Sequence, residues 1–387
     1  MIPHPQMHFV LKTHSRCNLT CKYCYVYTKA DQEWRNRPKE MPVDVFNAAV
    51  SRIADHVKST EQITTRILFH GGEPCLSEPA KMRRWCEAIT QSLGIGADIR
   101  FSIQTNGTLL SEDWAQLFKD FNFAVGISLD GPREINDVNR IYTDGRGSFN
   151  TVTKGLDLLH SSEVKFSLLS VIQPGQSGLK THDALRRLGP ESIEYIFPDE
   201  THISVKKIRK QWGSTPCADF LLPIFDFWWY EGTMDLMVSP FVAIAKTLLG
   251  GKSGVDFIGN DPLPVLFIQT DGAYEGIDVL GACKQGATVL DGNVFHTPIE
   301  QALVRPSLAR DFILGPLDLP TDCHGCREQY TCSGGYLPHR FDGIDSFDNP
   351  SVWCADLLKI FDHMREKLDI TPAETIAKRQ ALVELYE

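Results

Sequence analysis

Three cysteines crowd one short stretch near the N-terminus, and thiolates in such a group bind metal. The stretch reads Cys17-Asn-Leu-Thr-Cys21-Lys-Tyr-Cys24. Thiolates are soft ligands that select zinc, copper(I) or iron–sulfur clusters. Iron–sulfur clusters usually take four cysteines, so three would leave one iron open to a substrate or cofactor. The spacing alone also allows a zinc site that a distant His or Cys completes.

A second group of cysteines lies toward the C-terminus, in a Gly-rich stretch with weak periodicity. Its members are Cys323, Cys326, Cys332 and Cys354. Four thiolates complete the shell of one zinc ion or of one [4Fe–4S] cluster, and the spacing alone slightly favours zinc. A region with little regular structure and clustered thiolates is often held by metal rather than by a large core.

Two glycines and a carboxylate follow a predicted strand, in the order Gly71-Gly72-Glu73-Pro74. Glycine lets the backbone approach a ligand closely. Glu73 adds a carboxylate near the end of the strand, which suits an α-amino group. In isolation this segment would equally predict a turn.

Composition sets limits on the class of protein. The chain has 387 residues, 42% of them hydrophobic, and its 39 Lys and Arg against 49 Asp and Glu give a net charge of −10. This charge argues against a nucleic-acid binder that uses a broad basic face. The sequence shows no signal peptide and no long apolar run, so we expect a cytoplasmic protein without a membrane span. In such a protein, 11 cysteines more often hold metal or perform chemistry than form disulfides.

Predicted β-strands precede the chemical groups of the N-terminal half. Six short β-rich runs alternate with helical patterns, at His8–Lys12, Arg66–His70, Asp98–Gln104, Ala124–Leu129, Lys165–Ile172 and Ser192–Phe197. The first helical pattern places its apolar residues on one face, at Phe46, Ala49, Val50, Ile53 and Val57. Ser111 and Ser148 are predicted helix N-caps. Six βα units in series predict an open or closed α/β barrel whose chemistry lies at the carboxyl ends of its strands.

These residues resemble the radical S-adenosylmethionine (SAM) superfamily. The resemblance rests on the three-cysteine motif, with the aromatic Tyr23 before its last cysteine, and on the Gly-Gly-Glu-Pro segment after the second strand. It implies a [4Fe–4S] cluster on Cys17, Cys21 and Cys24 that binds SAM and cleaves it to a 5′-deoxyadenosyl radical. It also implies SAM contacts from Tyr23, Gly71, Gly72, Glu73, Asn106, Ser128 and Arg140.

The C-terminal cysteines then resemble the SPASM auxiliary-cluster domain of peptide and protein maturases. The implied fold is a partial (βα)6 TIM-like barrel at residues 5–230, an auxiliary-cluster domain at 235–370 and a terminal helix at 371–387. Members with two auxiliary clusters have a further cysteine where this chain has Tyr336, so we expect one auxiliary [4Fe–4S] cluster, on Cys323, Cys326, Cys332 and Cys354. Cys75, Cys86 and Cys217 are expected in the core, and Cys283 is expected as a buried or partly exposed thiol.

The segment from Gln269 to Leu280 and the sequence before Cys354 are similar to the FxsB-like maturases, which form three-residue cyclophanes. This similarity implies hydrogen abstraction at Cβ and crosslinking of that carbon to an aromatic ring. The base is expected among Asp271, Glu275 and Asp278. Other SPASM chemistry is the alternative: thioether formation, epimerisation, or the Ser or Cys oxidation of sulfatase maturation. In sulfatase maturases an Asp follows the cysteine matched by Cys283, whereas here Lys284 follows it.

The implied substrate is a ribosomally made precursor peptide, and the implied electron donor is a flavodoxin or a ferredoxin. The chain begins almost directly at its first strand. Leader recognition is therefore expected from the barrel mouth, the C-terminal region or a separate leader-binding protein. A metal-stabilised scaffold without activity is the non-enzymatic alternative, and the two intact N-terminal motifs weigh against it.

Overall fold

The chain divides into two compact units in the computed structural model, which describes residues 6–94, 96–231, 235–259 and 261–386. The first unit comprises Met1–Leu129, Asn136–Leu168 and Pro264–Leu314, and the second comprises Asp130–Ile135, Leu169–Leu263 and Gly315–Glu387. Residues 5 and 387, the outer limits of the predicted segments, lie outside the described residues. The predicted segment limits themselves remain a proposal.

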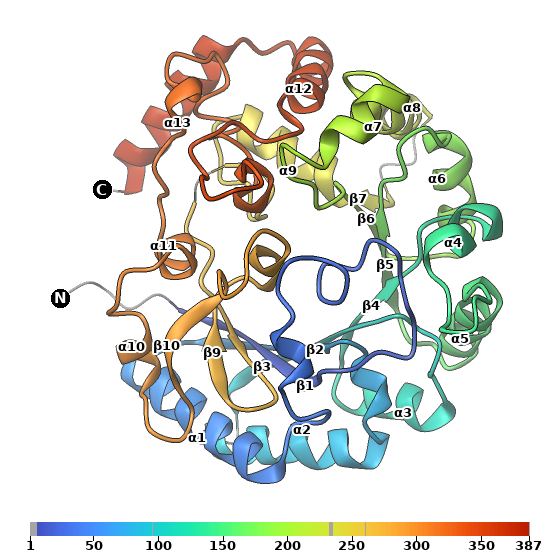
Figure 1. The fold of residues 1–387 in the computed structure, drawn as a ribbon, viewed down its shortest axis with the longest axis vertical. Coiled ribbons are helices and arrows are strands. Elements are labelled where there is room, and N and C mark those ends of the chain that lie inside the picture. The colour runs from blue at the N-terminus through green and yellow to red at the C-terminus, as the bar shows by residue number, and fades with distance from the viewer. Residues whose placement is uncertain (1–5, 95, 232–234, 260, 387) are drawn as a thin grey trace. The chain divides into compact units, whose positions relative to one another are not determined.

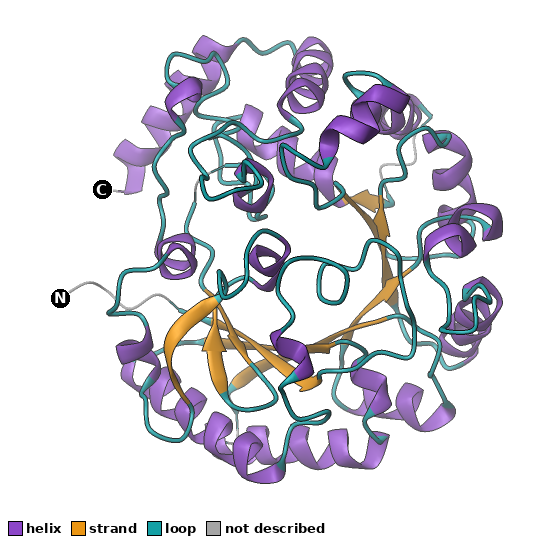
Figure 2. Ribbon diagram, viewed as in Figure 1, coloured by secondary structure: helices purple, strands orange, loops and turns teal. Residues whose placement is uncertain are grey.

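The first unit is built on a mixed β-sheet (Figures 1 and 2). Its strands lie in the order β10-β9-β8-β1-β2-β3-β4. Their bounds are β1 His8–His14, β2 Thr64–Gly71, β3 Asp98–Thr105, β4 Ala124–Ser128, β8 Val265–Ile268, β9 Ala273–Glu275 and β10 Val289–Asn293. Neighbours from β8 through β4 are parallel, and β9 and β10 are antiparallel to the strands beside them. The parallel sheet places the carboxyl ends of β1–β4 at one edge.

Buried and more exposed side chains alternate along β2 and β3, and the buried ones form part of the core of the first unit. The buried side chains of β2 and β3 include Phe69 and Phe101, whose rings stack at a centroid distance of 6.1 Å, and Phe123 stacks on both rings. Aromatic rings in offset stacks bury large apolar areas and fix the spacing between neighbouring strands. On each strand, the residues that alternate with these phenylalanines face the opposite side of the sheet.

Helices cover the outer side of this sheet, with α1 and α2 running beneath β1 and β2 in Figure 1. Their bounds are α1 Val43–Ser59, α2 Pro79–Leu93, α3 Glu112–Asp120, α5 Phe149–Ser161, α10 Ile299–Ala302 and α11 Leu308–Leu314. The predicted face of α1 is buried except at Val57, which is part-exposed. The Ser111 cap is confirmed, because its hydroxyl accepts from the Trp114 N–H at 3.4 Å. Ser148 is the N-cap residue of α5, as predicted, but its hydroxyl accepts from the Asn136 amide at 3.1 Å and not from a backbone N–H of the helix.

The second unit carries the remaining elements, apart from two that contain residues of both units, α4 Arg133–Asn139 and β5 Phe166–Val171. Its members are α6 Gly178–Arg186, β6 Ser192–Ile196, α7 Val205–Trp212, α8 Pro216–Tyr230, β7 Met237–Val238, α9 Ser239–Leu248, α12 Cys354–Leu368 and α13 Pro372–Tyr386. β6 and β7 pair in parallel. The apolar helix α8 packs against α6 and α12.

A buried ion pair stabilises the second unit. The Arg365 guanidinium donates to both carboxylate oxygens of Glu328, at 2.8 and 2.7 Å, and Glu328 is fully buried. Two parallel hydrogen bonds between a guanidinium and a carboxylate are stronger than neutral ones. No described helix is long and apolar enough to cross a bilayer.

All six predicted strands are present, and every predicted end lies within two residues of the observed end. The strands β8, β9 and β10 were not predicted. They extend the sheet beyond β1, so residues 264–314 join the first unit. Their runs of three to five residues are too short for periodicity to distinguish from irregular chain.

Candidate functional site

The three N-terminal cysteines lie on the loop that leaves β1. The Leu19 N–H donates to the Cys17 sulfur at 3.4 Å, and the Cys24 N–H donates to the Cys21 carbonyl at 3.2 Å. Burial raises the pKa of Cys17 to about 12, and repulsion from Glu73, Cys21 and Cys24 adds to the increase. The thiols are therefore close enough to repel one another when ionised. Soft donors that repel one another are stabilised by bound iron, so this set fits an iron–sulfur cluster.

No three Cys, His, Asp or Glu side chains among the described residues converge as they would around a single metal ion. A [4Fe–4S] cluster binds each thiolate through a different iron, so its ligands surround a volume rather than a point. The fit of the loop to a cluster therefore rests on its donor chemistry.

Gly71 and Gly72 are required where β2 ends against the cysteine loop. A Cβ at Gly71 would lie 2.2 Å from the His14 carbonyl oxygen, and one at Gly72 would lie 1.8 Å from the Tyr27 hydroxyl. Gly72 also donates its N–H to the His14 carbonyl at 2.8 Å. Both glycines thus allow close packing of protein on protein. The sequence also predicts that the backbone at these two glycines contacts SAM, and that role stays a prediction.

Glu73 links the second and third strand ends. It is fully buried, and one carboxylate oxygen accepts from the Cys75 N–H at 2.8 Å and from the Thr105 hydroxyl at 2.5 Å. The other oxygen accepts from the Asn106 N–H at 2.7 Å. Burial raises the pKa of Glu73, although these hydrogen bonds favour the ionised form. The second oxygen keeps acceptor capacity, so a contact to an amino group is still compatible with this arrangement.

Asn106 holds the cysteine loop at the end of β3. Its side-chain amide donates to Asn18 at 2.9 Å and contacts the Cys17 sulfur at 3.7 Å. Its carbonyl oxygen accepts from the Thr108 hydroxyl at 2.7 Å. This predicted SAM contact therefore already orients a cluster cysteine.

Ser128 lies at the end of β4, where its hydroxyl accepts from the Gln104 amide at 2.9 Å. Gln104 is on β3, next to β4 in the sheet. The part-buried Ser128 is thus held at the sheet edge where ligands bind in parallel α/β sheets.

Arg140 and Tyr23 lie together beside the last cysteine of the loop. The Arg140 guanidinium is 5.5 Å from the centre of the Tyr23 ring. Burial raises the pKa of the Cys24 thiol, and the charge of Arg140 opposes that increase. The backbone also joins the two segments, because the Thr20 N–H donates to the Ile141 carbonyl at 2.7 Å. Arg140 therefore places positive charge next to a predicted cluster ligand.

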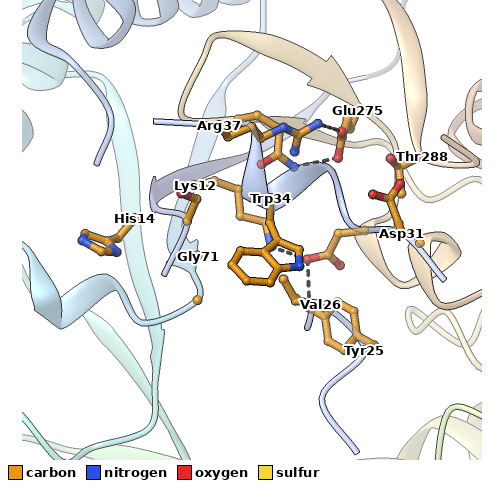
Figure 3. Close-up of a pocket in the computed structure, with 15 residues that line it drawn as sticks. Lys12, His14, Tyr25, Val26, Asp31, Trp34, Arg37, Gly71, Glu275 and Thr288 are labelled. Atoms are coloured by element: carbon orange, nitrogen blue, oxygen red, sulfur yellow. Dashed lines mark hydrogen bonds and ion pairs between the residues drawn. The ribbon is translucent and has the colours of Figure 1, made fainter. Parts of the chain in front are cut away.

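A pocket opens beside this loop within the first unit, with an empty volume of about 540 Å³ including the solvent at its mouth (Figure 3). It is lined by Lys12, His14, Ser15, Tyr25, Val26, Asp31, Trp34, Arg37, Gly71, Gly72, Gln269, Glu275, Asp278, Gly281 and Thr288.

Asp278 is a carboxylate of this pocket that contacts the residue directly after the cluster cysteines. Its Oδ2 accepts from the hydroxyl of Tyr25, the residue after Cys24, at 2.8 Å. The same oxygen forms a buried ion pair with Lys12. Burial alone would raise the pKa of Asp278, but the charge of Lys12 and the hydrogen bonds from Lys12 and Tyr25 outweigh it and lower that pKa. Asp278 is therefore ionised and able to accept a proton.

His70 completes this group as a neutral side chain. Burial and the charge of Lys12 lower the pKa of His70 to about 3. Its Nδ1 lies 2.8 Å from the Lys12 ammonium, which must donate to it. Lys12 thus donates to one neutral ring and one carboxylate, and both hold it in place.

Glu275 and Asp271, the other two predicted bases, are both held by Arg37. Glu275 forms an ion pair with Arg37 and accepts from the Gln269 amide at 2.6 Å, as Figure 3 shows for the guanidinium and the carboxylate. Asp271 lies 3.6 Å from Arg37, and its other oxygen accepts from the Ala273 N–H in a turn. Asp271 and Glu275 are therefore held by Arg37, whereas Asp278 is held by Lys12 and Tyr25.

The four C-terminal cysteines come together in the second unit. Burial raises the pKa of Cys332 far above its ordinary value, and repulsion from Cys354, Cys323 and Cys326 contributes. Arg340 lies close enough to lower the pKa of Cys332. Cys354 is the first residue of α12, where the helix dipole stabilises a thiolate. The four cysteines therefore fit the ligand set of one iron–sulfur cluster.

The other cysteines lie where the sequence predicts. Cys75, Cys86 and Cys217 are buried, and Cys283 is 7% exposed. Tyr336, at the position of a possible further ligand, is buried against the His339 ring at a centroid distance of 5.0 Å.

Sequence reasoning missed Lys12, Tyr25 and His70 as site residues. A lysine inside a predicted buried strand was one available signal, because lysine is rarely buried without a partner. Its partner Asp278 is 266 positions away, and no local pattern predicts that contact.

The chain is similar in sequence to known proteins. The Radical SAM superfamily model matches residues 11–188. The chain is 26% identical over 374 residues to a cysteine-type anaerobic sulfatase-maturating enzyme of Clostridium novyi, covering 95% of this chain and 96% of that enzyme. It is 24% identical to a serine-type anaerobic sulfatase-maturating enzyme of Bacteroides thetaiotaomicron, covering 92% and 89%.

The fold matches a solved structure over almost the whole chain. Native anSMEcpe with bound AdoMet and Cp18Cys peptide superposes with a TM-score of 0.79 at 23% identity, covering 94% of this chain and 98% of that one. At this identity the likeness establishes the fold.

Proposed function

We infer that this protein, whose residues 11–188 belong to the radical SAM superfamily, removes two electrons and two protons from a side chain of a peptide or protein substrate. The observation that carries this inference is the ionised, part-buried Asp278 in a pocket that begins at the cluster loop. Full-length similarity to sulfatase-maturating enzymes supports a peptide or protein as the substrate.

The chain's own residues hold the cofactors in this proposal. Cys17, Cys21 and Cys24 would bind the [4Fe–4S] cluster, which supplies with SAM the radical that abstracts hydrogen. Asn106 orients Cys17, and Arg140 places its charge beside Cys24.

We propose the second group of cysteines as the ligands of one auxiliary [4Fe–4S] cluster, which would supply an electron acceptor. Arg340 contributes positive charge beside it. The ligands would be Cys323, Cys326, Cys332 and Cys354.

Asp278 would take the second proton. The Lys12 ion pair keeps its carboxylate ionised at neutral pH, and the Tyr25 hydroxyl orients Oδ2. A general base must lie within hydrogen-bond reach of the proton it accepts, and the pocket gives Asp278 such access.

We propose oxidation of a Cys or Ser side chain, as in sulfatase maturation, as the first candidate reaction. The similarity to both cysteine-type and serine-type enzymes supports it. One residue argues against this reaction: Lys284 stands where sulfatase maturases have an Asp. Lys284 is exposed, however, and Asp278 supplies a carboxylate to the pocket instead.

An FxsB-like cyclophane crosslink is the second candidate, because the segment from Gln269 to Leu280 resembles those maturases. This reaction needs the same proton acceptor, and it removes the same number of electrons, two, from the substrate. The substrate would then be a ribosomal precursor peptide.

Anaerobic reconstitution followed by mass spectrometry tests the proposal. We expect about eight iron atoms per chain, as two four-iron clusters require, and SAM cleavage under reductant. An aldehyde trapped by a hydrazine would support the first reaction; it forms directly at a former Ser, and at a former Cys after water hydrolyses the thioaldehyde and releases hydrogen sulfide. A loss of two hydrogens without fragmentation across three residues would support the crosslink. Bound zinc and no SAM cleavage would contradict both.

We propose a reducing cytoplasmic setting and a flavodoxin or ferredoxin as the electron donor. None of the 11 cysteines, all of which lie within the described residues, forms a disulfide, as is usual in a reducing compartment.

A further inference from the structure

Helix α7 concentrates positive charge in a chain whose net charge is −10 (Figure 1). The sequence from Thr201 to Ala218 contains no Asp or Glu. Its basic side chains, all on α7, are Lys206, Lys207, Arg209 and Lys210. An acidic protein is repelled by a surface of like charge, so a local basic face determines where such a protein can dock.

Three of these side chains form one exposed face of the helix, which we call the α7 basic face. Lys210 lies four positions after Lys206 and three positions after Lys207, so the three are neighbours on the helix surface. All three are exposed. Within the described part of the chain, no carboxylate forms an ion pair with any of them. Their charge is therefore available to a partner.

The fourth basic residue, Arg209, joins α7 to the segment that carries a proposed auxiliary-cluster ligand. Its guanidinium donates to the carbonyl of Val352, two residues before Cys354. The Cα atoms of Val352 and Cys354 are therefore at most about 7 Å apart. Burial raises the pKa of the Cys354 thiol, and the charge of Arg209 opposes that increase.

The residues before α7 contact the same segment. His202 Nε2 lies 2.9 Å from the carbonyl oxygen of Pro350. Trp353, the neighbour of Cys354, is fully buried and donates its indole N–H to the carbonyl of Pro198 at 3.0 Å. Contacts before and within α7 thus hold the helix against the chain that leads into Cys354.

Exposed apolar side chains lie at both ends of α7. Ile203 is 54% exposed and Trp212 is 41% exposed. The Trp212 ring packs over Gly175, where a Cβ would lie 2.4 Å from the ring. Protein interfaces combine apolar and aromatic contacts with a polar rim, and α7 offers both kinds of contact.

We propose that the α7 basic face is the docking surface for an acidic flavodoxin-type electron carrier. The proposal rests on the proposed function, in which the substrate loses one electron with the abstracted hydrogen atom and the other to the auxiliary cluster. The docked carrier would collect this second electron. The reduced cluster then returns to its oxidised state, and the oxidised flavin takes up that electron and one proton from water to form the neutral semiquinone.

The size and place of the α7 basic face favour such a carrier over a nucleic acid. Residues 206–210 span only about 6 Å of helix, whereas nucleic-acid affinity increases with the number of phosphates that a protein neutralises. Electron-transfer encounters use small interfaces, below about 1,200 Å². The link from Arg209 to the chain before Cys354 also places this small face beside a proposed redox centre.

Calorimetry on the anaerobically reconstituted full-length protein tests the docking surface, with a purified acidic flavodoxin in its oxidised form as the probe. At low salt we expect affinity weaker by about 10- to 100-fold when all three lysines of the α7 basic face are replaced by glutamate. The difference should vanish at 1 M salt, where the Debye length is about 3 Å. The matched control makes the same charge change at three exposed lysines of the first unit and should bind as the unchanged protein does. Its substitutions are Lys58→Glu, Lys119→Glu and Lys154→Glu.

Three results would overturn the docking surface. They are no binding of the flavodoxin, equal affinity of the two triple variants, and an affinity that salt does not change. Tighter binding of a DNA duplex than of the flavodoxin, lost in the same triple variant, would assign the α7 basic face to nucleic acid instead. Replacement of the three lysines by glutamine gives a second variant if the glutamate variant does not fold.

A parallel measurement separates this proposal from the proposed function. Dithionite is a small chemical reductant that needs no docking surface, so the glutamate variant should cleave SAM with dithionite as fast as the unchanged protein. Absence of cleavage in the unchanged protein would refute the proposed function. The flavodoxin affinities would still decide whether the α7 basic face binds an acidic carrier.

Discussion

Replacing Asp278 by asparagine separates proton transfer from radical formation. The amide has the size of the carboxylate and still accepts hydrogen bonds from Lys12 and Tyr25, but it cannot accept a proton at neutral pH. If Asp278 is the base, Asp278→Asn should cleave SAM at close to the normal rate and form little product. Uncoupled cleavage of SAM is therefore the expected phenotype.

The magnitude follows from the contacts of Asp278. General base catalysis contributes about 10²- to 10⁴-fold, so product formation should fall by that factor, or about 3–5 kcal/mol in the barrier. Breaking a buried ion pair costs about 3–5 kcal/mol of stability. The cost here should be only about 1–3 kcal/mol, because His70 and the amide oxygen still accept from Lys12.

The assay compares 5′-deoxyadenosine and modified peptide in the same anaerobic reaction. Asp271→Asn is the matched variant, because Asp271 belongs to the same segment but lies in a turn and is 39% exposed. The base assignment is wrong if Asp278→Asn forms product normally while Asp271→Asn does not. Loss of iron together with loss of cleavage in Asp278→Asn would show instead that the residue supports the cluster.

Other substitutions test the clusters and the second unit. Cys17→Ala should abolish SAM cleavage, whereas Cys332→Ala should allow uncoupled cleavage without product, and a fully active Cys332→Ala would refute the auxiliary role. Arg365→Met should lower the free energy of unfolding in urea by about 3–5 kcal/mol, because it leaves the buried Glu328 charge alone; a change below about 1 kcal/mol would contradict this. The Glu194 pKa is raised from 4.5 to about 7 in the folded protein, so stability is lost as pH rises through that range. Glu194→Gln should therefore gain at most about 3 kcal/mol at pH 8 and nothing at pH 4, and equal gains at both pH values would contradict the raised pKa.

Local patterns predicted the parts of the fold that local physics determines. The six βα-type strands and the buried face of α1 follow from alternation and helical periodicity, which act within a few residues. The cap at Ser111 is predictable for the same reason. The Ser148 hydroxyl accepts instead from the Asn136 amide, a contact that no local pattern predicts.

The sequence predicts candidate ligands for both proposed clusters, which stay predictions, but not the contacts that hold them. Polar residues after the predicted strands indicated the edge of the sheet. The reason for Gly72 lies in the Tyr27 hydroxyl, and the state of Asp278 depends on Lys12. Such contacts join distant parts of the chain, so they require the three-dimensional structure.

The pairing of β8 with β1 has a consequence for synthesis on the ribosome. His8 pairs with Val265, a separation of 265 − 8 = 257 residues. At about 5–20 residues per second, one edge of β1 lacks its partner for roughly 13–50 s after it is made. During that time the nascent sheet exposes an edge that can pair with other chains. The same delay applies to Asp278, so a nascent chain presents the proposed cluster cysteines before the proposed base is made. If the proposed function is correct, early iron loading would give a species that generates radicals without completing the reaction.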